Sequence, residues 1–67
     1  MWIVADEKLL GYMIGRPSAA GFTKMVVQRV DVAKGGDPTL IDRTTLVMDY
    51  RKATKEDEER FLIKLGF

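Results

Sequence analysis

Strong helix signals occur at one place in the sequence, close to its C-terminal end. Thr54 is followed three residues later by Asp57, which resembles a capping box, where two such side chains satisfy backbone groups at a helix start. Acidic residues follow in the first turn and Lys64 lies near the end, which matches the helix dipole. Gly66 can adopt the left-handed conformation that ends many helices. The sequence therefore predicts a C-terminal helix, and the residues before Thr54 must supply its packing partner.

The remainder of the chain has the patterns of β-strands. Residues 2–5 and 9–14 are largely apolar and are separated by three polar residues, which predicts a hairpin. Residues 22–33 form the longest β-prone run, and apolar side chains on both of its faces indicate a doubly covered strand or a bulge. Residues 39–53 predict a last strand, with even-numbered apolar positions alternating with mostly polar odd-numbered ones.

Glycine and proline mark the connections between these strands. Residues 15–21 contain two glycines and a proline and predict a loop, and residues 34–38 form the clearest break in the chain. The loop could hold an anion on its backbone N–H groups, but it lacks a phosphate-binding fingerprint, so a plain connection is expected. Gly11, inside the second strand, indicates either a bulge or the close approach of another backbone.

Together these elements predict one α+β domain over residues 1–67. A small antiparallel sheet of three to four strands, made of the hairpin, the long strand and the last strand, is packed by one C-terminal helix. From the Met1 start and the capped end at Phe67 we expect a complete gene product. The apolar face of the last strand and the apolar stripe of the helix should cover each other. The expected core comprises Leu46, Met48, Phe61, Leu62 and Leu65.

The composition limits the chemistry that the chain can perform. It contains neither cysteine nor histidine, which removes disulfides, thiolate zinc sites, a cysteine nucleophile and the commonest acid–base side chain. The acidic run at residues 56–59 points in several directions around a helix, as is typical of a solvated first turn rather than a metal site. We expect a chain that is not an enzyme and that holds no cofactor and no metal.

Hydrophobic segments are short. The apolar stretch at residues 1–5 ends in charged residues, and no run approaches the roughly 20 residues needed to cross a bilayer. The sequence therefore predicts a cytoplasmic protein without a membrane partner. A formal net charge of +1 does not by itself imply attraction to nucleic acid.

Charged residues of the sheet are the candidates for contact with a partner. Lys24 and Arg29 have opposite parity, so an ideal strand would display them on opposite sides. If the helix covers one side of the sheet, Arg29, Asp31, Asp49 and Arg51 should lie on the other, together with the threonines at positions 23 and 45. The predicted partner-binding residues are Arg16, Lys24, Arg29, Asp49 and Arg51.

Two functions are compatible with these observations. Small free-standing domains without catalytic residues often act as adaptors, inhibitors or regulators, as accessory proteins of viruses and mobile elements do. We therefore expect a non-catalytic protein-binding regulator or inhibitor that occupies a partner's surface through a polar sheet face or a strand edge, and a homodimer is compatible with this function. The alternative is a small nucleic-acid-binding domain with a basic sheet face. Its contacts would come from Arg16, Lys24, Arg29, Lys34 and Arg51.

Overall fold

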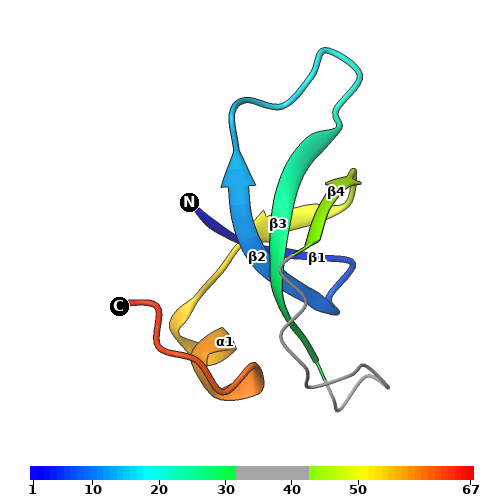
Figure 1. The fold of residues 1–67 in the computed structure, drawn as a ribbon. Helices are drawn as coiled ribbons and strands as arrows, with labels where there is room; N and C mark the ends of the chain where they lie inside the picture. Colours follow the sequence, from blue (N-terminus) through cyan, green and yellow to red (C-terminus); the bar gives the residue numbers. More distant parts are fainter. Residues whose placement is uncertain (32–42) are drawn as a thin grey trace.

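The computed structural model describes residues 1–31 and 43–67, which form an antiparallel sheet and one short helix (Figure 1). The elements are β1 (Trp2–Ala5), β2 (Leu9–Ile14), β3 (Thr23–Val30), β4 (Arg43–Val47), β5 (Tyr50–Lys52) and α1 (Lys55–Arg60). The five strands lie in the order β4-β3-β2-β1-β5. The predicted α+β fold is confirmed, and the described residues contain five strands where three to four were predicted.

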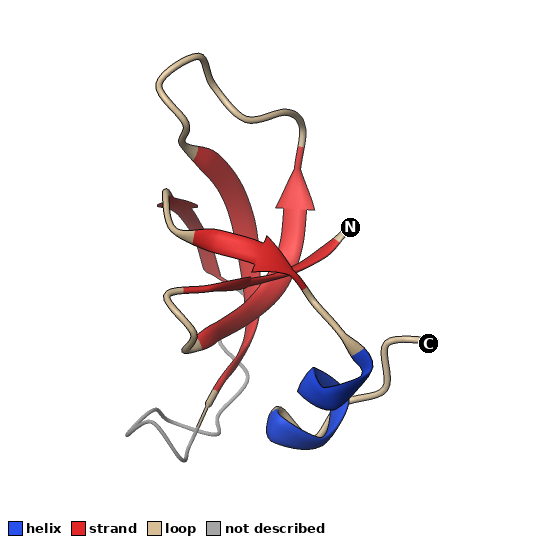
Figure 2. Ribbon diagram, turned by 180° about the vertical axis from the view of Figure 1, so that it is seen from behind, coloured by secondary structure: helices blue, strands red, loops and turns tan. Residues whose placement is uncertain are grey.

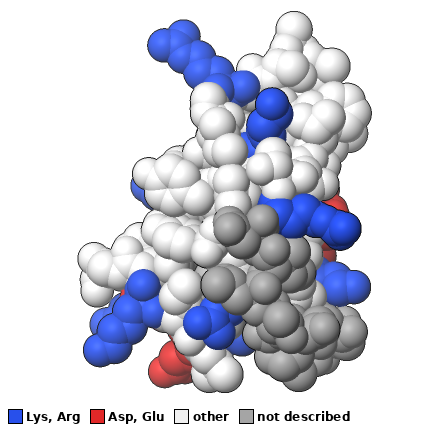
Figure 3. All heavy atoms as spheres, viewed as in Figure 1, with Lys and Arg blue, Asp and Glu red and all other residues white. Residues whose placement is uncertain are grey.

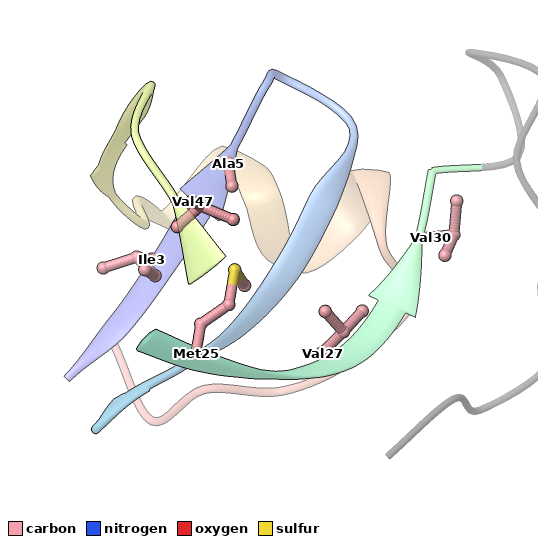
Figure 4. Packing of buried hydrophobic residues seen from close by; sticks show 6 residues of the cluster. All are labelled: Ile3, Ala5, Met25, Val27, Val30 and Val47. Carbon is pink, nitrogen blue, oxygen red and sulfur yellow. The ribbon is translucent and has the colours of Figure 1, made fainter. Parts of the chain in front are cut away.

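The sheet curls into a partly closed barrel, because its two outer strands are neighbours in the chain. β4 and β5 lie at opposite ends of the strand order, although only Met48 and Asp49 connect them. The concave side of the sheet therefore encloses a core, which Figure 4 shows from close by. This concave core consists of Ile3, Ala5, Met25, Val27, Val30 and Val47, with Leu9, Met13 and Tyr50 packed against it.

The helix and the C-terminal tail pack on the other, convex side of the sheet, at one end of the barrel (Figure 2). There a second cluster contains the buried Val4, Leu10, Ala53 and Phe61, with Trp2, Ile63 and Leu65 against it. Val4 points into this cluster, whereas its neighbours Ile3 and Ala5 point into the concave core. β1 is therefore buried on both faces and forms the centre of the fold.

A bulge in β3 changes which of its side chains share a face. Leu10 lies opposite Arg29 and Gly11 lies opposite Val27, so Gln28 is the extra residue. The predicted bulge is thus confirmed, and so is the close approach at Gly11. A Cβ atom there would collide with the backbone oxygen of Val26, which excludes every side chain larger than hydrogen unless the backbone shifts.

The prediction of one continuous last strand was wrong for its described part. The chain turns at Met48 and Asp49, and the Asp49 carbonyl accepts a hydrogen bond from the Asp6 amide at 2.8 Å. Val47 lies opposite Thr23 on the concave side of the sheet and is buried in the concave core. Leu46 and Met48 are 64% and 57% exposed, so their predicted place in the core was wrong.

The helix begins where the sequence predicts but ends earlier. Thr54 is its N-cap, and the Thr54 amide donates to a carboxylate oxygen of Asp57 at 2.7 Å, as expected of a capping box. The helix ends at Arg60, so the predicted apolar stripe does not form. Phe61 is buried as expected, whereas Leu62 adopts a left-handed φ of 54° and is 78% exposed. Its predicted burial was therefore wrong.

The loop between β2 and β3 is the connection predicted at residues 15–21. Ser18 organises it, because the Ser18 amide donates to the carbonyl of Phe22 at 2.7 Å and the Ser18 hydroxyl accepts from the Phe22 amide at 3.2 Å. Gly21, at a φ of 91°, allows the chain to turn back toward β3. The break predicted at residues 34–38 and the basic residue Lys34 lie outside the described residues.

Candidate functional site

One group of charged side chains lies where α1 approaches the β1–β2 turn and β5. We call it the ion-pair network, and it consists of Glu7, Asp31, Arg51, Asp57 and Arg60. Arg51 lies between two carboxylates: its Nε donates to Glu7 at 2.6 Å and its Nη1 donates to Asp57 at 2.8 Å. Its Nη2 also donates to each of them, so both pairs are bidentate.

Arg60 forms the second half of the ion-pair network. Its Nη2 donates to Asp31 at 2.7 Å and to the backbone carbonyl of Glu7 at 2.8 Å, and its Nη1 donates to Asp57 at 3.1 Å. Asp31 and Asp57 are only 2% and 1% exposed. A buried carboxylate is stable only when it is paired, and these two guanidinium groups supply the pairing.

The network holds Glu7 and Asp57 in the ionised form. Hydrogen bonds from Arg51, and further ones from Thr54, lower the pKa of Asp57 to about 2. The pKa of Glu7 is also lowered, chiefly by its hydrogen bond with Arg51, and the hydrogen bond with Asp31 raises the pKa of Arg60. Neither carboxylate is thereby tuned toward neutral pH for proton transfer. The arrangement instead ties α1 to the hairpin and to β5.

A different surface lies on the convex side of β2, β3 and β4. The register places Tyr12 opposite Val26, and it places Lys24 between Ile14 and Leu46, so all five side chains share the convex face. Tyr12, Ile14 and Leu46 are 49%, 44% and 64% exposed. We call this surface, together with the adjoining loop residues, the convex patch; it consists of Tyr12, Ile14, Arg16, Phe22, Lys24, Val26 and Leu46.

The helix and the tail cover one half of the convex face, and the convex patch is the other, uncovered half. Leu10 lies beneath the helix and tail, whereas Tyr12 and Ile14, the next side chains of β2 on the same face, are exposed. The rings of Trp2 and Tyr12 meet edge-on, with centroids 5.6 Å apart, at the border between the two halves. A helix of six residues is too short to cover both halves.

An open hollow lies at the loop end of the convex patch. Its apolar walls are Ile14, Phe22 and Leu46, its basic groups are Arg16 and Lys24, and Gly15 and Ser18 complete it. In Figure 3, Lys and Arg side chains rise from a mostly uncharged surface at the end of the molecule that carries the β2–β3 loop. The visible acidic groups lie away from that end. Among the described residues, neither Arg16 nor Lys24 forms an ion pair.

The structure separates the five residues predicted to contact a partner. Arg16 and Lys24 come together at the hollow. Arg29 also faces the convex side, because the bulge reverses its parity, and its Nε is buried with no hydrogen-bond partner in residues 1–31 and 43–67. Arg51 belongs to the ion-pair network, and Asp49 is exposed in the turn between β4 and β5. Partner contacts by all five remain predictions.

The polar face predicted for Arg29, Asp31, Asp49, Arg51 and the two threonines does not form. Asp31 is buried in the ion-pair network. Thr23 lies opposite Val47 on the concave side and is 1% exposed, and its hydroxyl has no hydrogen-bond partner among the described residues. Thr45 lies opposite Met25, also on the concave side. The grouping was wrong because the sheet is curled and bulged, so its two sides are not simply one covered face and one wet face.

Sequence reasoning missed the apolar members of the convex patch. The period-two alternation of residues 9–14 puts Tyr12 and Ile14 on one side of β2 with Leu10, but nothing in that pattern says where a covering helix ends. A usable signal is a sheet face with more apolar side chains than the predicted helix can bury, because a short helix covers only part of such a face.

A second hollow lies at the C-terminal end and is a weaker candidate. Its lining includes Leu62 and Phe67, which are both exposed, together with Glu58, Glu59 and Lys64. Both signs of charge occur there, so its surface selects no particular charge on a partner. Within residues 1–31 and 43–67 there is no cluster of metal-binding side chains, and no helix is long and apolar enough to span a membrane.

Comparison of the chain with protein-family models, with curated proteins and with solved structures gave no match. A function for this chain therefore has to be inferred from the geometry of the convex patch.

Proposed function

We propose that this chain is a non-catalytic protein-binding module, a regulator or inhibitor that acts by occupying a partner's surface with its convex patch. The observation that carries this proposal is the uncovered half of the convex face, where Tyr12, Ile14, Phe22 and Leu46 are all at least two-fifths exposed. A contiguous apolar patch with a polar rim is typical of protein–protein contact sites. Aromatic residues and arginine are enriched in such sites, and the patch contains both.

The distribution of charge supports the same proposal. The basic residues of the patch have no ionic partner among the described residues, so they remain available to an incoming surface. The arginines of the ion-pair network, in contrast, are engaged with buried carboxylates. If these arginines turned outward to contact a partner, the buried carboxylates would lose their compensating charge.

Nucleic-acid binding is the second candidate, and one observation favours it. The bulge at Gln28 places Lys24 and Arg29 on the same convex face, which an ideal strand would not do. A phosphate backbone could follow these two residues and Arg16. The aliphatic side chains of Ile14 and Leu46 favour the protein partner, because they offer no flat ring on which a base could stack.

A matched pair of leucine substitutions tests the proposal. Leu46 lies in the convex patch and Leu62 lies in the C-terminal tail, and both are well exposed, at 64% and 78%. Immobilised protein would be used to capture partners from the cells that produce it, with the wild type, Leu46→Gln and Leu62→Gln compared side by side. We expect Leu46→Gln to lose the captured proteins and Leu62→Gln to retain them. Equal capture by the two variants would overturn the assignment of the docking surface.

Salt dependence separates the two candidate functions. Binding of a labelled single-stranded oligonucleotide would be titrated from low to high salt, because phosphate contacts give a steep slope whereas specific protein docking need not. Tight oligonucleotide binding that Arg16→Gln and Lys24→Gln weaken, with no protein captured through Leu46, would favour the nucleic-acid function.

A further inference from the structure

The hollow at the end of the convex patch combines apolar walls with positive charge that forms no ion pair with a described residue. Ile14, Lys24 and Leu46 form one row across β2, β3 and β4, because Lys24 is the register partner of both neighbours. Phe22 closes the row on the side of the loop, and Arg16 borders it. The hollow is therefore a site for one large apolar side chain, with cationic groups within reach of its neighbours.

Among the residues that the structure describes, none that lines the hollow carries a carboxylate. These described residues therefore repel a positively charged segment and attract a negatively charged one. The aliphatic stem of Lys24 can lie along the apolar row while its ammonium group stays at the surface. The hollow is therefore suited to a segment that carries an anionic group next to an apolar side chain.

Resting on the proposed function, we infer that the partner presents an acidic peptide segment, in which one large apolar side chain fills the hollow. Carboxylates flanking that side chain would pair with Arg16 and Lys24. Charge complementarity carries this inference, because the ionisable groups that line the hollow within residues 1–31 and 43–67 are all basic.

A second copy of the chain fits the hollow less well. In a two-fold symmetric contact the same patch lies on both sides of the interface, so the basic residues Arg16 and Lys24 of one copy would lie against the same basic patch of the other. Like charges brought together in an interface oppose association. A symmetric homodimer through this surface is therefore disfavoured, and it becomes one outcome of the test.

The test uses amide NMR spectra of the full chain, titrated with a capped pentapeptide that has one phenylalanine between two pairs of glutamates. We expect shifts at the amides of residues 14–24 and at Leu46, and no comparable shifts in the C-terminal tail. Two control peptides replace the glutamates with lysines or the phenylalanine with serine. The basic peptide should leave the spectrum unchanged, and the serine peptide should bind several-fold more weakly than the phenylalanine peptide.

Protein variants locate the contacts. Arg16→Gln combined with Lys24→Gln should weaken peptide binding roughly fivefold, since exposed ion pairs contribute modestly, and added salt should weaken it further. Leu46→Gln should weaken it as well, whereas Leu62→Gln should not. The dispersion of each variant's spectrum shows whether the variant is folded.

Four outcomes would overturn the inference. They are equal binding of the acidic and basic peptides, shifts confined to the tail, no shifts at all, and shifts at residues 14–24 that arise from protein concentration alone, which would indicate a second copy. If the peptide does not bind but Leu46→Gln still abolishes partner capture, only the claim that the partner segment is acidic is rejected. Equal capture by Leu46→Gln and Leu62→Gln would reject the docking surface itself.

Discussion

The ion-pair network and the convex patch each contain two basic residues, but the surroundings of those residues differ. Arg51 and Arg60 are bonded to carboxylates that are almost fully buried, whereas Arg16 and Lys24 lie beside apolar side chains and form no ion pair with a described residue. Charges of the first kind hold the fold together, and charges of the second kind are available to a partner. Position in the fold, and not residue type, separates the two roles.

The largest effect should come from the centre of the ion-pair network. Asp57→Asn removes the charge that both arginines share, and it should lower the free energy of unfolding by roughly 3 kcal/mol, as expected when one partner of a buried pair is lost. Urea denaturation measures this change. Glu59→Gln, which alters an exposed carboxylate of the same helix, is the control and should change the stability by less than about 0.5 kcal/mol. Equal effects of the two changes would make the network dispensable.

Acidification should have the second-largest effect on stability, because it removes the charge of Asp57. The ordinary pKa of the Asp57 carboxyl is 3.8, and its pKa in the folded protein is about 2. Because the folded pKa is the lower one, the contribution of Asp57 is complete above its unfolded pKa and is lost as the pH falls through about 2. The wild type should therefore lose roughly 2 kcal/mol more than Asp57→Asn over this range. Parallel stability curves for the two proteins would contradict this prediction.

The helix cap should contribute less. The Thr54 hydroxyl donates to Asp57 at 3.2 Å, and it lies at the N-cap where a polar side chain stabilises a helix start. Thr54→Ala should cost about 1 kcal/mol, measured from the denaturation midpoint. Lys55→Ala, at the next exposed position, should leave the midpoint nearly unchanged. An unaltered midpoint in Thr54→Ala would show that Asp57 alone caps the helix.

The smallest effect on stability should come from the convex patch. Arg16→Gln combined with Lys24→Gln removes two exposed charges that have no described ionic partner, so stability should change by less than about 0.5 kcal/mol. The same denaturation experiment measures it. A loss as large as that of Asp57→Asn would erase the distinction between the two regions.

Local signals in the sequence predicted the local features well. The hairpin, the loop after Ile14, the helix start at Thr54 and the crowding at Gly11 all depend on a few adjacent residues, and all are confirmed. The predicted core was wrong for Leu46 and Leu62 because burial depends on what covers a side chain. Leu46 lies opposite Lys24 on the uncovered part of the convex face, and the helix ends before Leu62.

The candidate site was predictable only in part. Arg16 and Lys24 were identified by their charge, but the alternation could not show that Arg51 would be engaged by Glu7 and Asp57, which are 44 and 6 residues away in the chain. The bulge at Gln28 inverted the expected side of Arg29. Such long-range pairings arise from the curl of the sheet, which no local pattern encodes.

The central position of β1 has a consequence for how the protein is made. β1 leaves the ribosome before the other four described strands. One of its edges pairs with β5, so that edge stays open until β5 has also emerged. During this time a strand that is apolar on both faces exposes unpaired backbone groups, which can recruit the strands of other nascent chains. Contacts between residues so distant in sequence also form slowly. The yield of native protein should therefore depend on how quickly the last third of the chain is translated and on chaperones that shield β1 until β5 arrives.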